Sequence, residues 1–141
     1  FLNFSYFPQL IYLDLSFNEI YLIDTILIFD SLNFLILSHN NLTELNIKES
    51  YEIFHIDLSF NQLDSFNHYY MNLNSLKKLS AIINNNFIRK ISIISESNFI
   101  ANHNEIEEVI CDFVGTDLLF FNLNYNKLRL LKSFCFSKSN I

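Results

Sequence analysis

The chain has 141 residues, of which 50% are hydrophobic and 17% charged, and its formal net charge is -6 at pH 7. This acidic balance, with no basic run longer than Lys77-Lys78, argues against nucleic acid as a partner, because phosphate contacts need clustered lysine and arginine. No segment approaches the roughly 20 consecutive apolar residues of a membrane-spanning helix.

A pattern of apolar residues and asparagine returns about every 22 residues, a period typical of solenoid repeats. It is clearest in LIYLDLSFNEI (10–20), LNFLILSHNNL (32–42) and IFHIDLSFNQL (53–63), which fit L-x-x-L-x-L-x-x-N-x-L with Leu, Ile or Phe at the apolar positions. A looser copy is LLFFNLNYNKL (118–128).

Two further copies, between residues 76 and 117, are degenerate. LKKLSAIINNN, from Leu76, places Asn84 at the expected asparagine position, but Asn86 leaves its register ambiguous by two residues. ESNFIANHNEI has Glu96 where an apolar residue is expected. We therefore predict a single domain, residues 1–141, of about six repeats that forms part of a longer array. The repeats are 10–31, 32–52, 53–75, 76–95, 96–117 and 118–141.

Each repeat should contain one short strand, in which alternate residues face opposite sides. Leu13 and Leu15 then point inward together, as do Leu35 and Leu37. A single coil cannot bury such pairs, but stacked coils bury a continuous apolar column. Because neighbouring parallel strands lie roughly 4.8 Å apart, the predicted stack is about 29 Å long.

The recurring asparagine follows each strand, and we expect its amide to hydrogen-bond backbone groups of its own coil and of the adjacent coil. The predicted ladder consists of Asn18, Asn40, Asn61, Asn84, Asn104 and Asn126. Because Gly115 is the only glycine, we also expect asparagine to occupy the tight turns that glycine usually occupies.

The segments that return along the opposite side are less regular. Ile106, Val109, Ile110 and Phe113 have helical spacing, which predicts a short helical turn. Residues 43–52 and 64–75 should be irregular or turn-like. The predicted fold class is therefore an α/β solenoid, with a parallel concave sheet of about six short strands and a mostly irregular or short-helical convex side.

The motifs LDLSFN (13–18), LILSHN (35–40) and IDLSFN (56–61) resemble the leucine-rich repeat superfamily, and the resemblance extends over about residues 10–136. They resemble in particular the extracellular repeats of animal receptors and secreted proteins. The alternation of shorter and longer repeats is similar to that of the leucine-rich immune proteins of insects. The resemblance implies protein recognition on the concave sheet and often an extracellular location. The chain departs from secreted members in having no cysteine-rich cap at either end.

The outward positions of the strands should form three columns along the concave face. The first reads Tyr12, Phe34, His55, Lys78, Asn98 and Phe120; the second reads Asp14, Ile36, Asp57, Ser80, Ile100 and Asn122; the third reads Ser16, Ser38, Ser59, Ile82, Asn102 and Asn124. Aromatic anchors in a mildly amphipathic groove are typical of protein interfaces. The candidate protein-binding residues are Tyr12, Asp14, Phe34, Ile36, His55, Asp57, Lys78, Phe120 and Asn122. The alternative is a solvated face that contacts nothing.

An aromatic residue immediately precedes most of the ladder asparagines. These residues are Phe17, His39, Phe60, His103 and Tyr125. We expect their rings to stack from coil to coil as packing; the alternative is an aromatic rim that reads a ligand.

The sequence carries no catalytic or metal-binding motif. It has no P-loop and no G-x-S-x-G elbow, and its histidines and cysteines lack metal-ligand spacing. Asp14 and Asp57 share a column about 10 Å apart, slightly beyond the window for paired glycosidase carboxylates, on an open face that does not exclude water. We therefore predict neither an enzyme nor a cofactor.

Two features bear on the compartment. Cys111 and Cys135 fall in successive coils on the convex side, where they either form a disulfide or fill core positions as free thiols. Asn3 and Asn41 begin the glycosylation sequons Asn3-Phe4-Ser5 and Asn41-Leu42-Thr43.

These patterns favour a noncatalytic protein-binding module that is secreted or at the cell surface, of a receptor or innate-immune type. One alternative is a structural or self-associating segment that uses the uncapped ends of the stack. Another is a regulatory repeat domain of an intracellular multidomain protein, with a cytoplasmic location.

Overall fold

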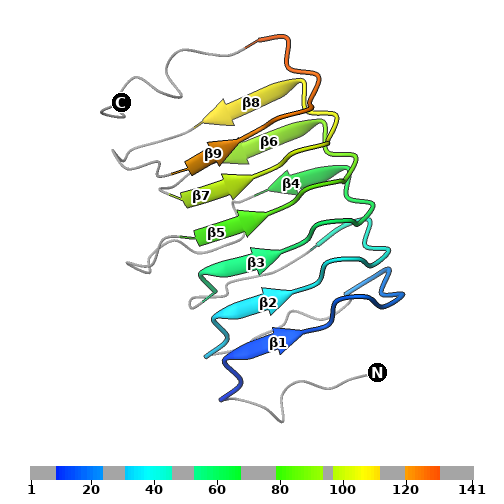
Figure 1. The fold of residues 1–141 in the computed structure, drawn as a ribbon, viewed down its shortest axis with the longest axis vertical. Coiled ribbons are helices and arrows are strands. Elements are labelled where there is room, and N and C mark those ends of the chain that lie inside the picture. Colours follow the sequence, from blue (N-terminus) through cyan, green and yellow to red (C-terminus); the bar gives the residue numbers. More distant parts are fainter. Residues whose placement is uncertain are drawn as a thin grey trace.

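The computed structural model describes residues 9–23, 31–45, 53–67, 79–93, 97–111 and 120–130. Over these residues the chain winds into a β-solenoid built from two parallel sheets on opposite sides of the coil (Figure 1). The larger sheet has six strands in the order β1-β2-β3-β5-β7-β9, and the smaller has three in the order β4-β6-β8. The predicted solenoid and its six-stranded parallel sheet are thus confirmed.

The larger sheet contains one short strand from each repeat. Its strands are β1 (Tyr12–Asp14), β2 (Phe34–Ile36), β3 (His55–Asp57), β5 (Leu79–Ile82), β7 (Ser97–Ile100) and β9 (Phe120–Asn122). The pairing is in register, so that Leu13 lies beside Leu35 and Leu35 beside Ile56. The alternation is clear in β2 and β3, where the middle residue is fully buried and its neighbours are half-buried.

The opposite side differs from the prediction, because the described residues contain strands there and no helix. The smaller sheet consists of β4 (Ser65–Asn67), β6 (Lys90–Ile93) and β8 (Glu108–Cys111). The helical turn expected around Ile106 to Phe113 is wrong: β8 occupies this segment, while Phe113 lies outside the described residues. The physical reason is that neighbouring coils satisfy the backbone of β8, and β-branched Val109 and Ile110 favour strands.

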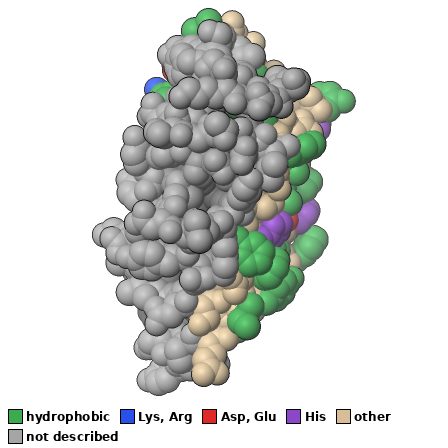
Figure 2. Space-filling model, turned by 90° about the vertical axis from the view of Figure 1, so that its left-hand side faces the viewer, with side chains coloured by type: hydrophobic (Ala, Val, Ile, Leu, Met, Phe, Trp, Pro, Cys, Tyr) green, Lys and Arg blue, Asp and Glu red, His purple; other side chains and the backbone are tan. Residues whose placement is uncertain are grey.

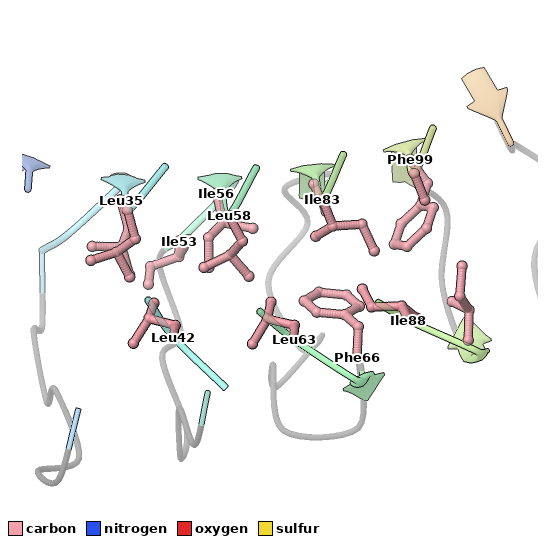
Figure 3. Close-up of a cluster of buried hydrophobic side chains, with 14 of the residues drawn as sticks. Leu35, Leu42, Ile53, Ile56, Leu58, Leu63, Phe66, Ile83, Ile88 and Phe99 are labelled. Carbon is pink, nitrogen blue, oxygen red and sulfur yellow. The ribbon is translucent and has the colours of Figure 1, made fainter. Parts of the chain in front are cut away.

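The core fills the space between the two sheets (Figure 3). Side chains from the larger sheet, such as Leu35 and Ile56, point toward side chains from the other side of the coil, such as Leu42 and Leu63. All four are fully buried. Fully buried apolar side chains extend from Leu32 to Ile106, so successive coils share one continuous core.

An asparagine ladder runs along the edge of this core. The Asn40 amide is typical: its Nδ2 donates to the carbonyl oxygens of Leu37 in its own coil (3.1 Å) and Leu15 in the preceding coil (2.9 Å). Its Oδ1 accepts the backbone N–H of Ile20, 2.9 Å away in the preceding coil. Asn61, Asn104 and Asn126 form the same kind of bonds backward along the stack.

In the fourth repeat the ladder asparagine is Asn86, and the prediction of Asn84 is wrong. Asn86 Nδ2 donates to the Leu58 and Ile83 carbonyls at 3.0 and 3.2 Å, and its Oδ1 accepts from Leu63 N at 3.0 Å. The two-residue ambiguity resolves this way because Asn86 places Ile83 in the core, where it is fully buried.

The tight turn before each ladder asparagine also differs from expectation. Among the described residues, those with positive φ are Phe17, His39, Phe60, Asn85, His103 and Tyr125, at 54° to 57°. Only one of them is asparagine, although a left-handed backbone costs a non-glycine residue roughly 1–2 kcal/mol. Backbone hydrogen bonds between coils hold these residues in place, for example from Phe17 N to Ser38 O at 3.0 Å.

The rings at these positions stack from coil to coil. His39 lies between Phe17 and Phe60, with centroid distances of 4.2 Å on both sides and interplanar angles of 10° and 11°. His103 and Tyr125 stack at 4.3 Å. Asn85, which carries no ring, separates the two stacks. This geometry agrees with the expectation that the rings stack from coil to coil as packing.

The ladder assignment can be tested at neighbouring positions. Asn86→Leu should lower the free energy of unfolding by about 2–4 kcal/mol, because it leaves buried N–H and C=O groups unsatisfied. Asn84→Leu, the matched control, should cost no more than about 1 kcal/mol, since within the described residues the Asn84 side chain accepts a single hydrogen bond, from Asn102 N. Urea unfolding measures both. An equal or larger cost at Asn84 would contradict the assignment.

The interrupted aromatic stack generates a second prediction. Asn85→His should join the two stacks and raise the free energy of unfolding by about 0.5–1.5 kcal/mol, because each new ring contact adds to stability. Asn85→Val should instead lower it by about 1–2 kcal/mol, because a β-branched residue fits poorly at a φ of 54°. Thermal and urea unfolding of both variants check this; destabilisation by histidine would argue against ring stacking.

Candidate protein-binding face

Three columns of side chains lie on the side of the larger sheet that faces away from the core, which we call the outward face. Strand pairing and the matching turn positions define them. They are Tyr12, Phe34, His55, Ser80, Asn98 and Phe120; Asp14, Ile36, Asp57, Ile82, Ile100 and Asn122; and Ser16, Ser38, Ser59, Asn84, Asn102 and Asn124.

The fourth repeat corrects three positions. Lys78 is not a member of the first column, because Ser80 pairs with His55, and Lys78 itself lies outside the described residues. Ile82 replaces Ser80 in the second column, and Asn84 replaces Ile82 in the third. The cause is the same two-residue shift that moved the ladder to Asn86. The eight other candidate residues lie in the predicted columns.

An aromatic cluster covers the outward face over β1 to β3. The ring of Phe34 lies 5.8 Å from Tyr12, 5.9 Å from His55 and 4.6 Å from Phe54 in an edge-on arrangement. Tyr12 is 54% exposed, and Phe120 on β9 is 50% exposed. Figure 2 shows hydrophobic and histidine side chains gathered along one edge of the molecule.

Phe54 was not among the predicted site residues. Strand alternation assigns it to the inward side, together with Ile56 and Leu58. Phe54 lies just before β3, where the alternation of the strand does not apply. Its ring contacts that of Phe34 edge-on. The local sequence offers no signal for this contact, which depends on the packing of two adjacent coils.

The Asp and Asn side chains of the second column accept hydrogen bonds from residues of their own turns. Asp14 Oδ1 accepts the backbone N–H of Ser16 at 2.9 Å and its Oγ–H at 2.6 Å. Asp57 Oδ1 accepts Ser59 N at 2.9 Å, and Asn122 Oδ1 accepts Asn124 N at 3.2 Å. These side chains cap the ends of their strands, which is a structural role that coexists with exposure to a partner.

Hydrogen bonding shifts the acidity of one of these groups. The Ser16 hydroxyl, followed by the Ser16 N–H, lowers the pKa of the Asp14 carboxyl, and the Tyr12 side chain adds a smaller effect in the same direction. Asp14 is therefore ionised at neutral pH. Among the described residues of the three columns, the carboxylates of Asp14 and Asp57 are the only Asp, Glu, Lys or Arg groups, so this face is acidic.

The third column forms a second, outer asparagine ladder in the later repeats. Asn84 Oδ1 accepts Asn102 N at 2.7 Å, and Asn102 Oδ1 accepts Asn124 N at 3.0 Å. This ladder was not predicted, although the sequence contains its signal. Repeats four to six read Asn-x-Asn at the turn (84–86, 102–104 and 124–126), whereas repeats one to three read Ser-x-Asn.

Charged pairs link the later coils away from the outward face. Glu105 lies between Lys127 Nζ at 3.1 Å and Arg89 Nε at 3.4 Å, and Lys90 Nζ lies 3.6 Å from Glu108. Lys127, and to a lesser extent Arg89, lowers the pKa of Glu105. These pairs contribute to the charge pattern of the coil surface. Because they are exposed to solvent, they contribute little to the free energy of unfolding.

The remaining predicted sites are only partly within the described residues. Asn41 is exposed, as a glycosylated asparagine must be. Asn3 and Cys135 lie outside the described residues, so the choice between a Cys111–Cys135 disulfide and two free thiols stays open. The described part of the chain contains no group of three His, Cys, Asp or Glu side chains arranged to hold a metal ion. It also contains no helix of sufficient length and hydropathy to span a bilayer.

Comparison with known proteins found no matching family model, no matching curated protein and no matching solved structure.

The Ser16 contact generates a pH prediction. Ser16→Ala should raise the pKa of Asp14 toward its ordinary value of 3.8, because it removes the hydroxyl that stabilises the carboxylate. When the pKa of Asp14 is lower in the folded state than in the unfolded state, the ionised carboxylate stabilises the fold at pH values above the unfolded-state pKa. This stabilisation is lost as the pH falls through the folded-state pKa. The stability difference between wild type and variant should therefore shrink in acid.

Carboxyl titration by NMR measures this shift. The lowered pKa of Glu105, which depends on Lys127, serves as an internal control and should not respond to Ser16→Ala. An unchanged Asp14 pKa would show that the hydroxyl does not hold the carboxylate in solution.

Proposed function

We propose that this chain is a noncatalytic protein-recognition module of the leucine-rich repeat type, which binds another protein on its outward face. Three features support the repeat type: the motif returns with each strand of the larger sheet, an asparagine ladder follows these strands, and Leu, Ile and Phe fill the inward positions.

The observation that carries the proposed function is the aromatic cluster on an otherwise ordered sheet. Tyr12 and Phe34 expose ring surface on strands whose inward side chains pack in the shared core. Because the core holds these strands in place, binding costs little conformational entropy on this face. Tyrosine and other aromatic residues are enriched at the centre of interfaces, where lysine is depleted. The acidic side chains of Asp14 and Asp57 favour a partner that presents arginine or lysine beside an apolar surface.

An extracellular or cell-surface location, as in receptors and innate-immune proteins, accompanies this proposal. The exposed sequon at Asn41 supports it, as does the likeness of LDLSFN and IDLSFN to extracellular repeats. Self-association through the ends of the stack is the second candidate function, and the exposed side chains of the first and last described coils favour it.

The proposed function is tested by capture of partners from extracellular fluid on the immobilised full chain, followed by measurement of the affinity for each captured protein. The triple variant Tyr12→Ala, Phe34→Ala, Phe120→Ala should weaken binding at least about 30-fold, because truncated hot-spot residues each cost about 2 kcal/mol or more.

A matched control removes exposed rings that lie away from the outward face. The variant Tyr21→Ala, Phe87→Ala loses side chains that are 70% and 57% exposed, and it should bind like the wild type. Equal affinity of the triple variant and the wild type would place the interface elsewhere on the molecule.

A further inference from the structure

We propose that an uncharged planar heterocycle of the adenine type binds at the turn of the fourth coil, between the rings of Phe60 and His103. The site is the interruption of the aromatic stack at Asn85. It lies on the turns that follow the strands of the larger sheet, apart from the columns of the outward face (Figure 1). It is therefore a second binding site, and it does not depend on the proposed function.

The two rings beside the interruption each have only one stacked face. Phe60 stacks on His39 at 4.2 Å, and His103 stacks on Tyr125 at 4.3 Å, with nearly parallel planes in both pairs. Asn85 takes the corresponding position in the coil between them. Among the described residues, no ring stacks on the faces of Phe60 and His103 that are directed toward this coil. The interruption is therefore flanked by two aromatic faces.

The spacing between the flanking rings fits one more planar group. Successive rings of the stack lie 4.2 or 4.3 Å apart. Two coils separate Phe60 from His103, so the gap between their rings is about 8–10 Å wide. Backbone hydrogen bonds from Phe60 N to Asn84 O (2.9 Å) and from Asn85 N to Asn102 O (3.0 Å) fix this width. A flat ring midway would contact both faces at close to the distance already seen in the stack.

The Asn85 side chain lies at the base of this gap and carries unused hydrogen-bonding groups. It is half-buried, and within the described residues its Oδ1 and Nδ2 make no hydrogen bond, whereas the amides of Asn84 and Asn86 do. An amide is also shorter than the rings that fill this position in other coils, so the outer part of the gap is open. Phe60 is 48% exposed and His103 is also exposed, so solvent reaches both rings.

A free amide between two rings selects a particular class of ligand. The edge of the Asn85 amide presents a hydrogen-bond acceptor beside a donor. Such an edge pairs bidentately with the amino group and the adjacent ring nitrogen of adenine. The aromatic faces on either side add stacking to a base, which raises affinity. An amino-substituted planar heterocycle satisfies both requirements at once.

The charge of the chain favours an uncharged ligand over a phosphorylated one. The net charge is -6, and phosphate groups are bound by clustered lysine and arginine. Arg89 and Lys127, which follow the turns of the fourth and sixth coils, are paired with Glu105. The occupant is therefore a nucleoside or a similar neutral heterocycle, and not a nucleic acid.

Titration of the full chain with adenosine, followed by NMR, tests the proposal. Chemical-shift changes should be confined to Phe60, Asn85 and His103 and their neighbours, with a dissociation constant on the order of 1 mM for one stacked base. Purine riboside, which keeps the ring system and lacks the amino group, should bind roughly tenfold more weakly. AMP and oligoadenylate should bind no more tightly than adenosine, because they add phosphate charge.

Two substitutions at Asn85 separate binding from folding. Asn85→His fills the gap with a ring and should abolish the adenosine shifts, although it is expected to stabilise the fold. Asn85→Asp keeps the size of the side chain, removes its donor protons and should weaken binding roughly fivefold or more. The control Asn41→Asp makes the same change on an exposed residue of the second coil, and it should bind adenosine like the wild type.

Adenosine shifts that persist in Asn85→His would overturn the proposal, because they would come from another part of the molecule. So would the absence of shifts in the wild type up to the solubility limit of adenosine, or equal affinities for adenosine and purine riboside. Tighter, salt-sensitive binding of oligoadenylate would show that the chain recognises a nucleic acid and not a neutral heterocycle.

Discussion

The structure depends on the hydrogen bonds that each ladder asparagine makes to the preceding coil. Strands of three or four residues pair too briefly to hold a stack together, and the chain between them leaves backbone groups beside an apolar core. The buried Asn61 amide, for example, donates to two carbonyls of its own coil and to one carbonyl of the preceding coil. It also accepts a backbone N–H of the preceding coil. This sets the spacing and register of successive coils, and the columns of the outward face follow from that register.

The turn at the end of each strand divides its work among three adjacent positions, and the fourth repeat shows this most clearly. Asn84 belongs to the outer ladder, Asn85 adopts a positive φ, and Asn86 bonds into the core. The same residue type serves three purposes because an amide both donates and accepts, and because asparagine tolerates the left-handed region. In the other repeats aromatic residues take the middle position, where stacking of their rings offsets an unfavourable backbone.

Two surfaces with different chemistry result from this construction. The outward face joins an aromatic cluster to the carboxylates of Asp14 and Asp57, and its order comes from the core directly beneath it. The ends of the stack differ from each other because the ladder points in one direction, from each coil to the one before. A solenoid of this kind therefore has an outward face and two ends that differ in chemistry.

The sequence by itself determined the solenoid, the six parallel strands, the inward leucines and most of the outward columns, because these depend on residue alternation and on a motif that recurs along the chain. It also contained the Asn-x-Asn pattern that identifies Asn86, although Asn84 matches the repeat equally well when one repeat is considered alone. Only the tertiary structure decided the register of the fourth repeat, the contact of Phe54 with Phe34 and the replacement of the expected helical turn by β8. The physical reason is shared: each depends on hydrogen bonds or packing with an adjacent coil, and local spacing in the chain does not record which residues of two coils meet.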